Sequence, residues 1–157
     1  MELDTVNDNP LAFLAGASRE EIRANIMAFK DQLLELDAGQ CNLQVEHNVA
    51  DGIYTRKLFI PKGCMLVGKI HKKQCMNIVA KGDITVMTET GCARVQAGYT
   101  VQSPAGIMKV GYAHEDTIFI NVFRTDETDI AKIEEEIASE SFEVVPIEAE
   151  AKEALCL

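Results

Sequence analysis

Hydrophobic residues between residues 43 and 124 fall in short runs, not at the three- and four-residue spacing of a helix. The runs are rich in Val, Ile, Thr and Phe, and glycine or proline turn signals separate them. They read IYTRKLFI, MLVGKIH, MNIVA, DITVMTE, ARVQA, YTVQS, IMKVGYA and TIFINVFR. No helical pattern interrupts them, so the chain is predicted to form about eight strands of a sandwich or barrel, and parallel βαβ folding is excluded.

A helical pattern precedes the strands. Ser18 and Glu21 have the spacing of a capping box. The apolar residues that follow it at helical spacing are Ile22, Ile26, Phe29, Leu33 and Leu36. This pattern predicts an amphipathic helix over 18–39 that packs on its own domain, although the stripe is also a short heptad pattern that could pair with a second copy. Residues 1–17 show no sustained period, so we expect a flexible or loosely docked N-terminal arm there.

A second helix is predicted after the strands. Ile130, Ile133 and Ile137 form a narrow apolar stripe beside three consecutive glutamates. We therefore divide the chain into the arm 1–17, the helix 18–39, a β-barrel over 41–124 and an acidic helical C-terminal extension over 125–157.

The formal charge of −10 is unevenly distributed along the chain. Residues 1–40 carry −5, residues 41–124 carry +4 and residues 125–157 carry −9. This overall acidity disfavours nucleic-acid binding, because the phosphate backbone would be repelled. The acidic start lacks the profile of a secretion signal, and no apolar run has the length of a membrane span. We expect a soluble, intracellular, cytoplasmic protein without membrane contact, with its five scattered cysteines reduced.

The turn residues of the first half of the barrel resemble a motif of the cupin superfamily. In that family the motif runs glycine, five residues, H-x-H, three or four residues, glutamate, six residues, glycine. Here Gly63 and Gly82 stand at the two glycine positions. Lys69-Ile70-His71 stands at the H-x-H, and Cys75 stands at the glutamate.

The second cupin motif is matched in the same partial way. It runs glycine, five residues, P-x-G, two residues, histidine, three residues, asparagine. Gly98, Pro104 and Gly106 match, whereas Lys109 and Ala113 replace the histidine and the asparagine. The resemblance covers residues 53–124 and implies a mainly β protein. Its fold would be a single cupin-type double-stranded β-helix, or jelly-roll barrel, with an N-terminal amphipathic helix and a C-terminal helix. The chain is also similar to small cupin-like proteins encoded by tailed phages and bacteria.

The metal-binding chemistry of the family is mostly missing. Of the four usual ligand positions only that of His71 keeps the family's residue. A protonated lysine has no lone pair for a metal ion, so Lys69 and Lys109 are unsuited to a ligand shell. We therefore predict a metal-free protein without a cofactor. If a metal were bound, His71 and Cys75 would be its ligands.

The same substitutions predict a basic pocket. Residues two apart on a strand share a face, so Lys69 and His71 point the same way, and the family register would make that way inward. Lys109 would face them from another strand, and Arg56 and Tyr54 would complete a site for a carboxylate or phosphate. In the alternative reading the lysines extend to the mouth of the barrel and His71 is a hydrogen-bonded core residue.

These observations favour a non-catalytic, cupin-like binding or interaction protein that holds a small anionic ligand and forms homo-oligomers. One alternative is an enzyme, either an isomerase or lyase that uses Lys69 and His71 as acid and base, or a metal-dependent oxygenase with fewer ligands. Another is a phage structural or accessory protein. P-loop, dinucleotide-binding, zinc-protease and nucleophile-elbow motifs are absent from the sequence.

Overall fold

The computed structural model describes residues 9–35 and 43–139. Its helical elements are η1 (Ala12–Leu14), α1 (Arg19–Glu35) and α2 (Ile130–Ile137). Its strands are β1 (Gln44–Ala50), β2 (Ile53–Ile60), β3 (Met65–Val67), β4 (Ile70–His71), β5 (Cys75–Lys81), β6 (Asp83–Thr88), β7 (Gly91–Gln96), β8 (Thr100–Ser103), β9 (Val110–Ala113), β10 (Thr117–Arg124) and β11 (Ala138–Ser139).

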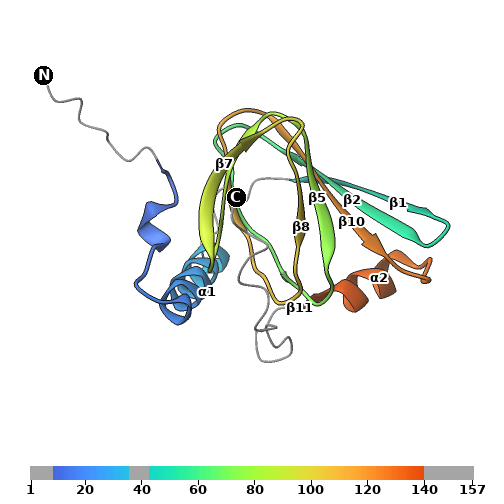
Figure 1. Ribbon diagram of the computed structural model, residues 1–157, viewed down its shortest axis with the longest axis horizontal. Coiled ribbons are helices and arrows are strands. Elements are labelled where there is room, and N and C mark those ends of the chain that lie inside the picture. The colour runs from blue at the N-terminus through green and yellow to red at the C-terminus, as the bar shows by residue number, and fades with distance from the viewer. Residues whose placement is uncertain (1–8, 36–42, 140–157) are drawn as a thin grey trace, which may run out of the picture.

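Nine of the described strands form two antiparallel sheets that enclose the core (Figure 1), and β4 and β11 form a separate two-stranded sheet. One sheet has the order β1-β2-β10-β5-β8 and the other has the order β3-β9-β6-β7. Strands far apart in the chain are neighbours in both sheets, as in a jelly roll, so the predicted fold is confirmed. None of the helices in the described residues is both long and apolar enough to span a membrane.

Two strand predictions need correction. β1 was not among the eight predicted runs, because it is an edge strand whose residues are mostly exposed and therefore carries few apolar residues. The run MLVGKIH forms two strands, because the chain leaves the sheet at Gly68 and Lys69. Its second part, β4, pairs with β11, which follows the last barrel strand and α2 in the chain.

Helix α1 begins as the sequence predicts, since the Ser18 hydroxyl accepts a hydrogen bond from the Glu21 backbone N–H at 3.1 Å. Its apolar stripe packs on the β3-β9-β6 side of the barrel, with Ile26 buried and Ile22 and Phe29 partly buried. The end expected at residue 39 lies outside the described residues. Within the predicted N-terminal arm, Leu11 and Leu14 are buried in the same cluster as Ile26.

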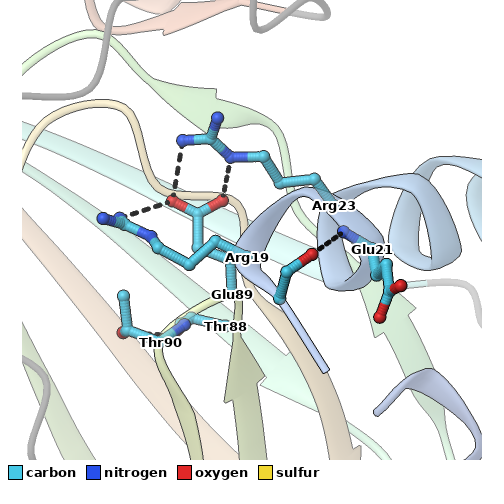
Figure 2. A network of polar contacts seen from close by, with 7 residues as sticks. Arg19, Glu21, Arg23, Thr88, Glu89 and Thr90 are labelled. Atoms are coloured by element: carbon cyan, nitrogen blue, oxygen red, sulfur yellow. Dashed lines mark hydrogen bonds and ion pairs between the residues drawn. The ribbon is translucent and has the colours of Figure 1, made fainter. Parts of the chain in front are cut away.

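A buried ion pair also fixes α1 to the barrel (Figure 2). Glu89, at the turn between β6 and β7, is only 3% exposed. Its carboxylate accepts from Arg23 Nε at 2.5 Å and from Arg19 Nη2 at 3.2 Å. Two guanidinium groups thus compensate the cost of burying one carboxylate.

Helix α2 closes the opposite side of the barrel. Asp129 caps it by accepting a hydrogen bond from the Lys132 N–H at 3.1 Å. Ile133 and Ile137 are buried against Tyr54 and Phe123. The extension therefore contains a short helix and the strand β11 over the described residues, and the rest of its predicted range, 140–157, lies outside them.

One cysteine departs from the expected reduced state. Cys64 is disulfide-bonded. Cys75 and Cys92 are free thiols.

Candidate functional site

A cavity of about 220 Å³ lies between the two sheets. Most of its walls are apolar, and a smaller part is basic or polar. The apolar lining residues are Leu43, Leu58, Ile60, Leu66, Val67, Ile84, Val86 and Phe119. The polar ones are Arg56, Lys69, His71, Lys109 and Asn121. The cavity therefore contains four of the five residues predicted to bind a ligand.

Strand register arranges these side chains in layers. Arg56, Asn121 and Asn77 lie side by side on β2, β10 and β5 and face the interior. Two positions along the strands in one direction, Leu58 lies beside Phe119. Because strand residues two apart share a face, the polar residues form one layer that is bordered by an apolar layer.

On its other side the polar layer meets a second apolar cluster. Tyr54 lies beside Phe123, and both pack against α2. We call the row of Arg56, Asn121 and Asn77, together with Lys109 from the facing sheet, the polar layer. It is enclosed between two apolar clusters, so each of its polar groups must be paired within the protein or by a ligand.

Arg56 has an incomplete set of partners. Its Nη1 lies 3.8 Å from Glu134 Oε2 of α2, which balances its charge in part. Its Nε is buried and has no hydrogen-bond partner in the described structure. A buried guanidinium N–H without a partner is energetically costly, so Arg56 has a donor available for an acceptor inside the cavity.

Lys109 enters the layer from the segment before β9. Its Nζ donates to the Ser103 hydroxyl at 2.8 Å, and its backbone oxygen accepts from Gly68 N at 2.8 Å. Burial lowers the pKa of the Lys109 amine, and the nearby Cys75 opposes that shift. The amine has two further protons that can be donated.

His71 is held rigidly beside Lys109. The residue is 7% exposed, and its ring meets the Phe123 ring edge-on at a centroid distance of 5.2 Å. Its backbone pairs with Ala138 of β11. Burial first, and then the charges of Lys109 and Arg56, hold the pKa of His71 well below its usual value. The imidazole is therefore neutral near pH 7.

The residues present do not fit a metal ion. Cys75 Sγ lies 3.5 Å from His71 Nδ1, so these two predicted ligands do meet. Burial raises the pKa of the Cys75 thiol, which disfavours the thiolate that a metal needs. In the described residues no third His, Cys, Asp or Glu joins them, and Lys109 lies nearby. His114, another conceivable ligand, instead bonds Thr85 Oγ1 at 2.7 Å.

Lys69 and Tyr54 differ from the rest of the predicted site. Lys69 lines the cavity with His71, but it lies outside the strand, just before β4, and is exposed at the mouth. Tyr54 does not line the cavity. It is one layer away, where its hydroxyl donates to Glu134 Oε1 at 2.5 Å and meets His47 Nδ1 at 2.7 Å. Tyr54 is thus a packing residue that anchors α2 to the barrel.

Sequence reasoning missed the two asparagines. Asn121 Nδ2 donates to Asn77 Oδ1 at 2.7 Å, while Asn77 Nδ2 is buried without a partner in the described structure. Asn77 lines a small void that Lys109 and Phe119 share with the cavity. An available signal was the asparagine at an inward position between Phe119 and Phe123 in the run TIFINVFR.

No protein-family model and no curated protein matches the chain. Solved structures match more than half of the chain. KdgF from Halomonas sp. is 17% identical, with 59% of this chain and 87% of that chain covered and a TM-score of 0.49. An RmlC-like cupin family protein from Methanocaldococcus jannaschii is 17% identical, with 57% and 85% covered and a TM-score of 0.46. A cupin superfamily protein from Desulfitobacterium hafniense is 8% identical, with 58% and 84% covered and a TM-score of 0.47.

These similarities concern the fold alone. The jelly-roll topology that the predicted resemblance implies is present in the strand order of this chain, with α1 and α2 packed against the barrel. The function of the cavity has to be argued from the side chains of this chain.

Proposed function

We propose that the protein is a non-catalytic binding protein whose cavity holds a small anion. Arg56 of one sheet and Lys109 of the other both line the cavity. Among the lining residues that the structure describes there is no aspartate or glutamate. An anion would offset the cost of burying these cations and would accept hydrogen bonds from them.

The observation that carries this proposal is the buried Arg56 Nε without a partner. A carboxylate or phosphate oxygen is the natural acceptor for a guanidinium N–H, since both anions match its planar geometry. The partnerless Asn77 Nδ2 adds a second donor in the same layer.

A thermal-shift measurement tests the proposal. Acetate, benzoate, malonate and inorganic phosphate are compared with sodium chloride at equal ionic strength. Binding to the folded state raises the melting temperature. We expect at least one anion to stabilise the wild type but not Lys109→Ala or Arg56→Gln. Lys81→Ala, at an exposed lysine outside the cavity, is the matched control and should retain the effect. If none of the four anions stabilises the wild type beyond sodium chloride, the proposal fails.

One observation favours an enzyme as the second candidate. His71 is a neutral imidazole in a cavity that also contains Lys109, so it can accept a proton from a bound acid. The test is exchange of the protons next to the carboxylate of a bound ligand in D₂O, followed by NMR. If the exchange is faster than in buffer and this acceleration is lost in His71→Gln, the protein is an enzyme and the non-catalytic proposal is wrong. The binding proposal expects no acceleration.

A further inference from the structure

The cavity is polar at one end and apolar at the other. Arg56, Asn121 and Lys109 form the polar end. On β2 the next inward residues are Leu58 and Ile60, so the walls beyond the polar layer are hydrophobic. A ligand that fills this space must therefore combine an anionic group with an apolar body. Apolar walls left in contact with water would not gain the free energy of hydrophobic burial.

The charges of the polar end match a single negative charge. Arg56 already lies 3.8 Å from the carboxylate of Glu134, so this pair is close to neutral. The Lys109 amine donates to the uncharged Ser103 hydroxyl at 2.8 Å, which leaves its charge unbalanced. One cation thus remains to be balanced in the interior, whereas Lys69 is exposed at the mouth. A monoanion meets this requirement, and a dianion would add an unbalanced buried charge.

The volume limits the size of the apolar body. A cavity of about 150 Å³ lined by aliphatic and aromatic residues accommodates benzene, and pockets for drug-sized ligands begin near 300 Å³. The present cavity, at about 220 Å³, falls between these values. It fits a body slightly larger than one ring.

Building on the proposed anion-binding function, we propose that the ligand is a monocarboxylate with a compact apolar body of about six to eight carbons. Its carboxylate binds between Arg56 and Lys109, and Asn77 Nδ2 is available as a further donor. Its body lies against Leu58, Phe119 and the facing strands.

Calorimetric titration of the full chain with a homologous series tests this inference. The probes are acetate, butyrate, hexanoate, octanoate and dodecanoate, with benzoate as a ring-shaped body of similar size. Each buried methylene should strengthen binding about three- to fourfold until the cavity is full. We expect affinity to rise to hexanoate or octanoate and to fall at dodecanoate. Hexanamide and 1-hexanol, which lack the charge, should bind at least tenfold more weakly than hexanoate.

Variants separate the two ends of the site. Lys109→Met keeps most of the side-chain volume but removes the charge, so it should weaken hexanoate at least tenfold and leave 1-hexanol unchanged. Val86→Leu adds a methylene to the apolar end, so its preference should move toward shorter acids. Lys81→Met is the surface control. If Lys109→Met does not fold, Arg56→Gln and the wild-type series still decide the question.

The outcomes distinguish the anion-binding function from the monocarboxylate proposed as its ligand. If acetate or phosphate binds as tightly as octanoate, the anion site stands but the apolar body is refuted. If 1-hexanol binds as tightly as hexanoate and Lys109→Met changes neither, the anion proposal itself is wrong. If none of the acids binds, both are overturned.

Discussion

Cys75 Sγ and His71 Nδ1 lie 3.5 Å apart in the interior of the barrel, and both groups are uncharged near pH 7. Burial raises the pKa of the thiol and lowers the pKa of the imidazole. The pair is thus the opposite of an activated thiolate–imidazolium couple, in which a positive neighbour lowers the pKa of the thiol.

We expect Cys75 to resist alkylation. It is 4% exposed, whereas Cys92 is an exposed free thiol. In iodoacetamide at pH 7.5, followed by peptide mass mapping, Cys92 should be modified first and Cys75 only after unfolding in guanidinium chloride. Labelling of native Cys75 as fast as Cys92 would contradict the burial of the Cys75 thiol.

The low pKa of His71 predicts a specific pH dependence of stability. The unfolded histidine takes up a proton near pH 6.5, but the buried one does not, so the unfolded state binds more protons as the pH falls. The free energy of unfolding should therefore decrease by about 1.4 kcal/mol from this residue between pH 7.5 and 5.5. Urea unfolding at the two pH values measures it.

His71→Gln is the comparison, because it removes the titrating group and should flatten this part of the curve. Asp83 does not interfere in that range. Hydrogen bonds from Arg94 and then Gln96 lower the pKa of Asp83 to about 2. The stabilisation that Asp83 provides is therefore lost only as the pH falls from about 4 toward 2. An equal loss of stability in wild type and His71→Gln would contradict the lowered pKa of His71 in the folded state.

Glu89→Gln should weaken the docking of α1. The substitution removes the negative charge that Arg19 and Arg23 share. We expect the free energy of unfolding to fall by about 1–3 kcal/mol. The loss is no larger because the arginines are partly exposed and solvent screens their interaction with Glu89. Glu20→Gln, at an exposed position of the same helical turn, should change it by less than about 0.5 kcal/mol. A similar effect of both variants in urea unfolding would mean that the ion pair contributes nothing.

Gly82 and Gly98 form a matched pair for alanine substitution. Both have positive φ, 93° and 94°, so alanine at either costs about 1–2 kcal/mol of backbone strain. At Gly82 the added Cβ would also lie 2.6 Å from the Asp116 carbonyl oxygen, whereas at Gly98 it meets nothing within 4 Å. Gly82→Ala should therefore lower the melting temperature clearly more than Gly98→Ala. Equal shifts would show that the turn after β5 relaxes.

These two glycines also explain why the fold was predictable. Their turn conformations are local, so the sequence reveals them directly, and they bracket strands whose apolar runs are equally local. The inward direction of Lys109 and His71 was implied by the register of the cupin motifs, which the same turn residues carry. Edge strand β1 was missed because an exposed strand has no strong apolar pattern.

The remaining parts of the site depend on long-range pairing. Tyr54 could line the cavity or lie in the neighbouring apolar cluster, depending on which residue of β10 it faces. That register is set by packing across the sheet. Glu134, which faces both Arg56 and Tyr54, lies 80 residues after Tyr54 and belongs to a different element. No local pattern brings these residues together, so only the folded chain shows that Arg56 is partly neutralised.

The polar layer has a consequence for redesign. Because hydrophobic clusters border it on both sides, the residues that supply polar contacts to a ligand and those that form the hydrophobic core occupy different positions along the strands. A combinatorial library varied only at residues 56, 77, 109 and 121 should retain the jelly roll in most members while sampling new ligand chemistries. The barrel could thus serve as a scaffold for engineered sensors of small molecules.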